Sequence, residues 1–219
     1  MSEAVRELQR RIEDLYEVEV PADVRDYLIT DARLARILEG GAGREGPERL
    51  LVRQDDEETL ELSLYLDEAL LRRFEADSPL RRLHDGNLET FCTVLEGVSH
   101  FVYLAWCAGR DRPVSLLELE LQAEVDKYAV GLSLAAEQRG GRVPAGLCRR
   151  LFEGVRYDPA LGREEHRRYA LANDRARAFC RGLHEALLAR RAGGQRVTRI
   201  LRRYYRLRPA AKLAAPPPV

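Results

Sequence analysis

The feature that most constrains the fold is an alternation of leucine with other residues over 60–66, where the chain reads LELSLYL. Every second side chain of a strand points to the same face, so four leucines share one face and the other face is solvated. The strand-forming run RLLVRQ at 49–54 precedes it, separated by the acidic DDEE. These segments predict a β-hairpin. Because a hairpin alone is marginally stable, helices must cover its leucine face.

Most of the remaining chain shows the three- and four-residue spacing of apolar side chains that is typical of amphipathic helices. The predicted helices cover residues 3–16, 32–40, 68–76, 88–107, 116–138, 145–155, 163–191 and 198–207. The segment YEVEV at 16–20 alternates in polarity and is the candidate for a third strand. We therefore predict an α+β fold, mainly α. A bundle of long helices packs with a small antiparallel β-hairpin or three-stranded sheet in the N-terminal third.

Several polar residues mark the starts of these helices. Asp67 precedes an apolar helical run and is a predicted N-cap, because its carboxylate can accept a hydrogen bond from a free backbone amide. Ser115 and Glu118 match a capping box. Ser78 followed by Pro79 matches an N-cap with proline in the first helical position, so we expect helical structure from Ser78 onward.

The formal net charge is zero, yet the charges are unevenly distributed along the chain. Residues 1–140 hold 17 basic and 30 acidic side chains, whereas residues 141–219 hold 19 and 6, which gives net charges of −13 and +13. The sign changes at RGGRVP, 139–144, the strongest helix breaker inside the chain. We predict a single domain over 1–208 with a sub-boundary at 139–144, followed by a flexible Pro/Ala-rich tail over 209–219.

The sequence also indicates a compartment. Its cysteines form no CxxC pair and lie among apolar neighbours, which is typical of reduced, buried thiols. The longest uninterrupted apolar run covers residues 101–108, whereas a membrane span needs about 20 residues. The N-terminus is charged throughout and lacks the apolar core of a signal peptide. We expect a soluble, cytoplasmic protein without membrane contact.

Common catalytic signatures are missing from the sequence. It contains no P-loop, no GxGxxG, no HExxH, no GxSxG and no EF-hand loop. These absences argue against the commonest nucleotide-binding, zinc-protease and hydrolase classes. They leave open an enzyme whose site is assembled from dispersed residues. We predict no cofactor, with a divalent metal ion as the alternative.

The candidate chemical site lies on the predicted helix 88–107. Glu96 and His100 are four residues apart and, at about 100° per residue, share a stripe that is distinct from the apolar face. A carboxylate beside an imidazole can orient a general base, supply two metal ligands, or form an ordinary ion pair on a solvated face. Di-iron bundle proteins use Glu-x-x-His on two helices, whereas this chain has one copy with longer spacing, which favours the ion pair.

Two further helices carry polar faces that could complete this site. Glu124 shares a face of the acidic helix with Glu120 and Lys127, and His166 lies on the polar side of the long basic helix. If these faces met, they would form a buried network, which is costly unless every group is paired. The candidate catalytic residues are therefore Glu96, His100, Glu124 and His166. The identity of any metal stays open.

The carboxyl-terminal part is rich in arginine. The segment RILRRYYRLR interleaves arginine with tyrosine, which suits contacts with phosphates and stacking on bases. The charges surround their helices, however, and pairing with the acidic half explains the pattern equally well. The candidate residues for binding nucleic acid or an acidic partner are Arg199, Arg202, Arg203, Tyr204, Tyr205 and Arg206.

Three functional hypotheses follow from these features. The first is a cytosolic interaction or regulatory protein without its own chemistry, which binds another protein or forms a homo-oligomer. The second is an enzyme or metal-binding protein with a helical His/Glu site. The third is a nucleic-acid-binding protein that uses its arginine-rich C-terminal helices. An exposed apolar patch would favour the first, a polar pocket the second, and a continuous positive groove the third.

Overall fold

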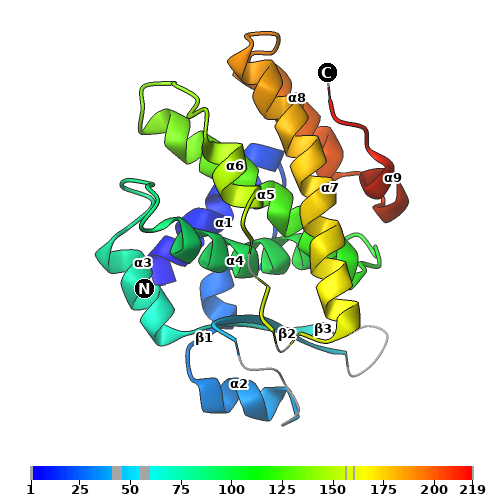
Figure 1. Cartoon of the computed structure of the whole chain (residues 1–219). Helices are drawn as coiled ribbons and strands as arrows, with labels where there is room; N and C mark the ends of the chain where they lie inside the picture. The colour runs from blue at the N-terminus through cyan, green and yellow to red at the C-terminus, as the bar shows by residue number, and fades with distance from the viewer. Residues whose placement is uncertain (1, 41–45, 55–59, 156, 160, 219) are drawn as a thin grey trace.

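The computed structural model describes residues 2–40, 46–54, 60–155, 157–159 and 161–218. Their secondary structure is mainly helical, with a small sheet in the N-terminal third, which confirms the predicted α+β class (Figure 1). The helices are α1 (Ser2–Tyr16), the 3-10 helix η1 (Val24–Tyr27), α2 (Ala32–Leu38), α3 (Glu68–Ala76), α4 (Leu88–Ala108), α5 (Leu116–Glu137), α6 (Leu147–Phe152), α7 (Arg163–Leu188), α8 (Gly194–Tyr205) and α9 (Pro209–Ala214).

The sheet has three strands in the order β1 (Leu28–Ile29), β3 (Leu60–Leu66) and β2 (Glu48–Gln54). β2 and β3 form the predicted antiparallel hairpin, and β1 adds a short parallel strand. Helices cover the leucine face of β3 as predicted, since Leu64 and Leu66 are fully buried. The acidic loop that connects the strands lies outside the described residues.

The opposite face of the sheet was expected to be solvated, and this expectation is wrong in part. α2 lies across that face, on the side away from the other helices (Figure 1). Tyr65 of β3 is buried there against Ala35 of α2 and Leu51 of β2. The sheet is therefore covered on both faces, by α2 on one side and by the helical bundle on the other.

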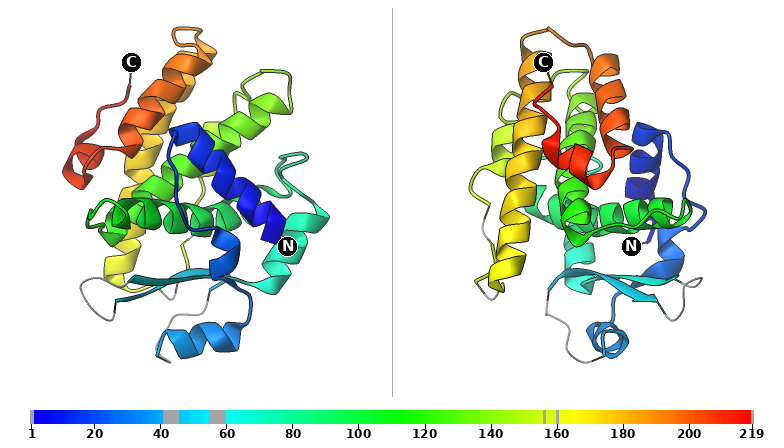
Figure 2. Two further views of the ribbon diagram at one scale, coloured as in Figure 1. Left: turned by 180° about the vertical axis from the view of Figure 1, so that it is seen from behind. Right: turned by 90° about the vertical axis from the view of Figure 1, so that its right-hand side faces the viewer.

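α4 is the central helix and lies between the hairpin and the rest of the bundle (Figure 2). It contacts α1, α3 and α5 as well as both long strands. Its close approach to the hairpin depends on Gly97, because a Cβ atom at this position would lie 2.8 Å from Glu48 Cγ and 2.9 Å from Leu64 Cδ1. The missing side chain thus allows β2 and β3 to pack directly against α4.

Two predicted elements are wrong. The segment YEVEV does not form a strand, because α1 continues to Tyr16 and the following residues are irregular; the third strand is β1. The Ser78–Pro79 pair does not begin a helix either. Ser78 instead accepts two backbone hydrogen bonds in a turn, from Arg81 and Arg82, and the next helix starts at Leu88.

The predicted N-caps at Asp67 and Ser115 are confirmed, but the Glu118 side chain pairs with Arg112 and Tyr103 and does not complete the predicted capping box. The Asp67 carboxylate accepts a hydrogen bond from the Leu70 amide. The Ser115 hydroxyl accepts one from the Glu118 amide at 3.2 Å. Each satisfies a backbone donor that has no partner within its own helix.

The C-terminal segment packs against the bundle. Within the predicted tail, residues 209–214 form α9, and Lys212 is 2% exposed. Pro217 and Pro218 lie against Gly182 of α7, where a Cβ atom would lie 2.9 Å from the Pro218 carbonyl oxygen. One cluster of buried apolar residues contains side chains from both sides of the breaker at 139–144.

α4 is long and apolar enough, by length and composition alone, to cross a membrane. Single polar residues divide its sequence, so it contains no long uninterrupted apolar run. Of its most apolar stretch of 18 residues, 67% is buried inside the fold, as in the core helix of a soluble protein. The finding is therefore weak support for a membrane span.

Replacing Gly97 with alanine should destabilise the protein by about 1–3 kcal/mol, since the added methyl group would overpack the contact with Glu48 and Leu64. Gly131 on α5 is a matched control, because a Cβ there would meet Phe91 Cε1 at 3.4 Å, an ordinary contact. Gly131→Ala should be neutral or stabilising by up to about 1 kcal/mol through helix propensity. Urea unfolding compares the two, and equal stabilities would contradict close packing at Gly97.

Candidate functional site

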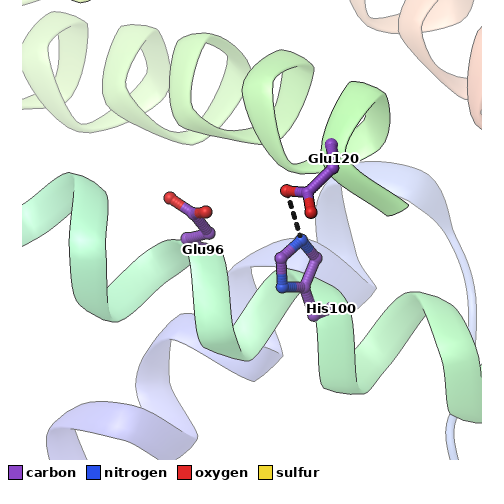
Figure 3. A group of neighbouring side chains, drawn as sticks. All are labelled: Glu96, His100 and Glu120. Atoms are coloured by element: carbon purple, nitrogen blue, oxygen red, sulfur yellow. Dashed lines mark ion pairs between the residues drawn. The ribbon is translucent and has the colours of Figure 1, made fainter. Parts of the chain in front are cut away.

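The candidate site lies between α4 and α5, where polar side chains of the two helices face one another (Figure 3). α4 contributes Glu96 and His100, one helical turn apart, and α5 contributes Glu120. One potential ligand atom from each residue lies within 4.8 Å of the other two. The polar stripe of α4 and the polar face of α5 therefore meet.

His100 lies between two carboxylates from other elements. Its Nδ1 atom is 3.6 Å from Oε1 of Glu48 on β2, and its Nε2 atom is 3.5 Å from Oε2 of Glu120. Since His100 is 8% exposed, water screens these charges weakly. Burial alone would lower the pKa of His100. The carboxylates of Glu120 and Glu48 outweigh burial and hold this pKa well above its ordinary value.

Glu96 forms its ion pair with a lysine. The Lys127 ammonium lies 2.7 Å from Glu96 Oε2 and 2.7 Å from Glu124 Oε1, so it bridges α4 and α5. Burial would raise the pKa of Glu96, but Lys127 and His100 hold it below its ordinary value. At Glu124 burial dominates and raises the pKa despite Lys127. The expected Glu96–His100 ion pair is therefore replaced by pairs with other elements, although the two side chains remain neighbours.

Five side chains form a Glu/His cluster: Glu48, Glu96, His100, Glu120 and Glu124. Its four carboxylates are opposed by two fixed cations, Lys127 and Arg168, and the Arg168 Nε atom lies 3.6 Å from Glu120 Oε1. Among the described residues, two negative charges therefore remain when the imidazole is neutral. Two buried atoms, Glu48 Oε1 and His100 Nε2, also have no hydrogen-bond partner within the described structure. A divalent cation would offset the carboxylate charge and take the place of the imidazole proton, which leaves Nε2 able to act as a ligand.

The fourth candidate catalytic residue lies elsewhere. The His166 ring packs against the Tyr157 ring, with centroids 5.0 Å apart, and lines a cavity at the start of α7. α7 reaches the Glu/His cluster through neighbouring residues instead. Arg168 pairs with Glu120, and burial, followed by the carboxylates of the cluster, raises the pKa of Tyr169 to about 12. The structure thus brings together Glu96, His100 and Glu124 and places His166 apart from them, against Tyr157.

Sequence analysis missed Glu48 as a partner of His100. A signal for it existed, because Glu48 and Leu50 pair with Leu66 and Leu64 across the hairpin and therefore lie on the same, helix-covered face. An acidic residue on the buried face of a strand requires a partner. Which helix would supply that partner could not be read from the alternation.

A second buried network joins α1, α4 and α5. The fully buried Asp126 carboxylate accepts hydrogen bonds from Tyr16 Oη at 2.5 Å, Ser99 Oγ at 2.6 Å and Gln122 Nε2 at 2.7 Å. Burial raises the pKa of Asp126 to about 6 in spite of these donors. Three elements are thus tied to one carboxylate.

The same network extends to α9 through a buried lysine. Lys212 Nζ donates to Tyr103 Oη at 2.6 Å and to Gln122 Oε1 at 2.5 Å. The Tyr103 hydroxyl donates in turn to Glu118 Oε1 at 2.7 Å. Burial lowers the pKa of Lys212 to about 7, although Glu118 and Asp126 oppose this shift. These contacts anchor the C-terminal segment to the centre of the bundle.

The proposed stacking role of Tyr204 and Tyr205 is wrong. Their exposures are 2% and 0%, and their rings pack on Phe179 and Tyr16, respectively, at 4.1 Å between centroids. The two adjacent tyrosines face inward from α8, whereas Arg203 and Arg206 on either side of them are exposed. Neither ring is accessible to a base.

The arginines of α8 are divided between internal contacts and solvent. Arg202 pairs with Glu17, and Arg206 donates to the Glu17 carbonyl oxygen at 3.0 Å. Arg199 and Arg203 are exposed. Part of the basic carboxyl half therefore contacts the acidic amino half of the same chain.

Comparison with protein-family models, curated proteins and solved structures finds no match for this chain. A function therefore has to be inferred from the geometry of the site.

Replacing Glu120 with glutamine should lower the pKa of His100, because the neutral amide no longer favours the imidazolium. Glu96→Gln should lower it less, since the ion pair of Glu96 is with Lys127. NMR titration of the imidazole measures both. A larger shift in Glu96→Gln than in Glu120→Gln would contradict these assignments.

The raised pKa of His100 also makes the stability of the fold depend on pH. The protonated imidazole stabilises the fold fully below the unfolded pKa of about 6.5, and this contribution is lost as pH rises through the folded pKa.

Proposed function

We propose that this protein binds a divalent metal ion through Glu96, His100 and Glu120. The observation that carries the proposal is the convergence of their ligand atoms to within 4.8 Å in a setting with excess negative charge. Carboxylate oxygens combined with one imidazole nitrogen suit first-row dications such as Mn²⁺, Fe²⁺ and Zn²⁺.

The surroundings of His100 support the same function. His100 Nε2 faces Glu120 and has no hydrogen-bond partner within the described structure, while Nδ1 faces Glu48. Metal-binding histidines characteristically donate their second ring N–H to a carboxylate, which fixes the tautomer and orients the ring. Glu48 is positioned for this role, so Nε2 would be the ligand atom.

The two fixed cations leave ligand atoms available. Lys127 pairs with Oε2 of Glu96, and Arg168 lies closest to Oε1 of Glu120. The remaining oxygens, Oε1 of Glu96 and Oε2 of Glu120, can therefore bind a metal while these ion pairs persist. Such outer contacts orient carboxylate ligands in the same way that Glu48 would orient His100.

Isothermal titration with Mn²⁺ and Zn²⁺, together with elemental analysis of the purified protein, tests this function. The wild-type protein should bind one equivalent, and Glu48→Gln should weaken binding by about 10–100-fold, the usual effect of losing an orienting partner. Glu120→Gln should weaken it at least as much. Glu89→Gln is the control, since Glu89 lies exposed on the same helix. Equal affinities in Glu120→Gln and Glu89→Gln would overturn the proposal.

An exposed apolar patch favours a second function, self-association. On α2, Leu34, Ile37 and Leu38 are 41%, 73% and 44% exposed. Contiguous apolar surface of this kind often marks an interaction site. α2, which carries the patch, lies on the far side of the sheet from α4 and α5 (Figure 1). If two copies of the chain packed against each other through this patch, both patches would be buried. The result would be the homo-oligomer of the first hypothesis.

Replacing Ile37 with lysine should abolish self-association, because a charge would lie in the centre of the contact. Light scattering after size-exclusion chromatography measures the mass over a range of protein concentrations. Val155→Lys is the control, since Val155 is 42% exposed and lies outside the patch. A monomeric wild-type protein at about 0.1 mM, well above the micromolar dissociation constants of many specific complexes, would contradict this function.

A cytoplasmic location remains part of the proposal. It is supported by the free cysteines, three of which are buried and none of which forms a disulfide within the described chain. The largely buried α4 is compatible with a soluble protein. Nucleic-acid binding is the least supported alternative, because its aromatic residues are buried and two of its arginines contact Glu17.

A further inference from the structure

A cavity at the start of α7 has the lining of an anion-binding site. Its volume is about 420 Å³, which is the size of a pocket for a small molecule. The side chains that matter for its chemistry are Tyr157, Asp158, Arg163, His166 and Arg167. The function proposed above leaves this cavity unexplained.

Three of these side chains are basic and come from one face of one helix. Arg163, His166 and Arg167 are separated by three and four residues, the spacing that brings side chains together on a helix. Among the described residues, no ion pair involves either arginine, and Asp158 is the carboxylate of the lining. With two arginines and one aspartate among its lining residues, the cavity has a net positive lining.

The chemistry of this lining selects oxyanions. Guanidinium groups present several N–H donors in a plane and bind phosphate or carboxylate through paired hydrogen bonds. His166 adds a further donor, and its ring is packed against Tyr157 at 5.0 Å between centroids. That contact constrains the imidazole beside the arginines.

The cavity is connected to the Glu/His cluster through adjacent residues. Arg167 lines the cavity, and the next residue, Arg168, lies 3.6 Å from Glu120 of the cluster. Tyr157 also lines the cavity, and its pKa is raised by burial and then by the Glu124 carboxylate. One turn of α7 and one loop therefore belong to the surroundings of both sites.

We infer that this cavity binds the phosphate or carboxylate group of a small dianionic ligand and holds it near the metal ion of the Glu/His cluster. The position near the metal rests on the proposed function, whereas anion binding by Arg163 and Arg167 does not. A bound dianion and a bound dication attract each other, so each should raise the affinity of the other by the same factor.

Titration of the metal-free protein with inorganic phosphate and with malonate tests the anion site. Calorimetry gives the affinity, and the His166 imidazole signals in NMR report binding in the cavity itself. Both probes carry the shared oxyanion chemistry, and their relative affinities distinguish a phosphorylated from a dicarboxylate ligand. Arg167→Gln should weaken binding at least about tenfold, the effect of one lost charge-assisted hydrogen bond. Arg175→Gln, at an exposed position farther along α7, should leave it unchanged.

Each outcome has a definite meaning. Failure of both probes to saturate the wild-type protein, or equal affinities in Arg167→Gln and Arg175→Gln, overturns the anion site. The phosphate titration is then repeated with one equivalent of Mn²⁺ bound. If Arg167→Gln weakens phosphate binding but bound Mn²⁺ leaves the phosphate affinity unchanged, the anion does not lie near the metal. Failure of Mn²⁺ to bind at all removes the metal function and that position, while the metal-free titration still decides the anion site.

Discussion

Charged side chains buried between α4 and α5 impose the main constraint on this structure. Removing an ion from water costs several kcal/mol even after relaxation, so each must find a partner within the fold. Glu96 of α4 pairs with Lys127 of α5, but the charges of His100 and Glu120 also have partners on other elements. β2 supplies Glu48 and α7 supplies Arg168, which approaches Glu120. The hairpin and α7 therefore supply charged side chains to the α4–α5 interface, in addition to packing against these helices.

The two buried networks differ in a way that separates structure from function. In the network around α9, the Asp126 and Glu118 carboxylates are matched by two cations, Lys212 and Arg112, although Glu118 Oε2 has no hydrogen-bond partner within the described structure. In the Glu/His cluster, Glu48 Oε1 and His100 Nε2 also lack hydrogen-bond partners, but here the carboxylates exceed the fixed cations among the described residues. A network that only stabilises the fold would be expected to balance its buried charges. The unbalanced one is therefore the better candidate for a ligand site.

Local patterns predicted those parts of the fold that local physics determines. The leucine alternation placed Leu64 in the core, and Asp67 began a helix, because side-chain period and capping act within a few residues. The stripe containing Glu96 and His100 was visible for the same reason. The partners of that stripe were only partly visible, since the approach of Glu48 depends on Gly97 and on strand register. The burial of Lys212 in α9 depends on contacts from distant helices, which no local period encodes.

Pairing between the acidic and the basic half of the chain explains the basic side chains of α8 but not those at the start of α7. At α8, Arg202 and Arg206 contact Glu17 of the acidic half, so internal pairing accounts for the basic composition there. At the start of α7 the basic side chains crowd together instead. Like charges three or four residues apart destabilise a helix, and a neutral residue at either position would cost the fold less. The placement of Arg163 and Arg167 beside a cavity is therefore better explained by an anion that enters it, as inferred above, than by attraction between the halves.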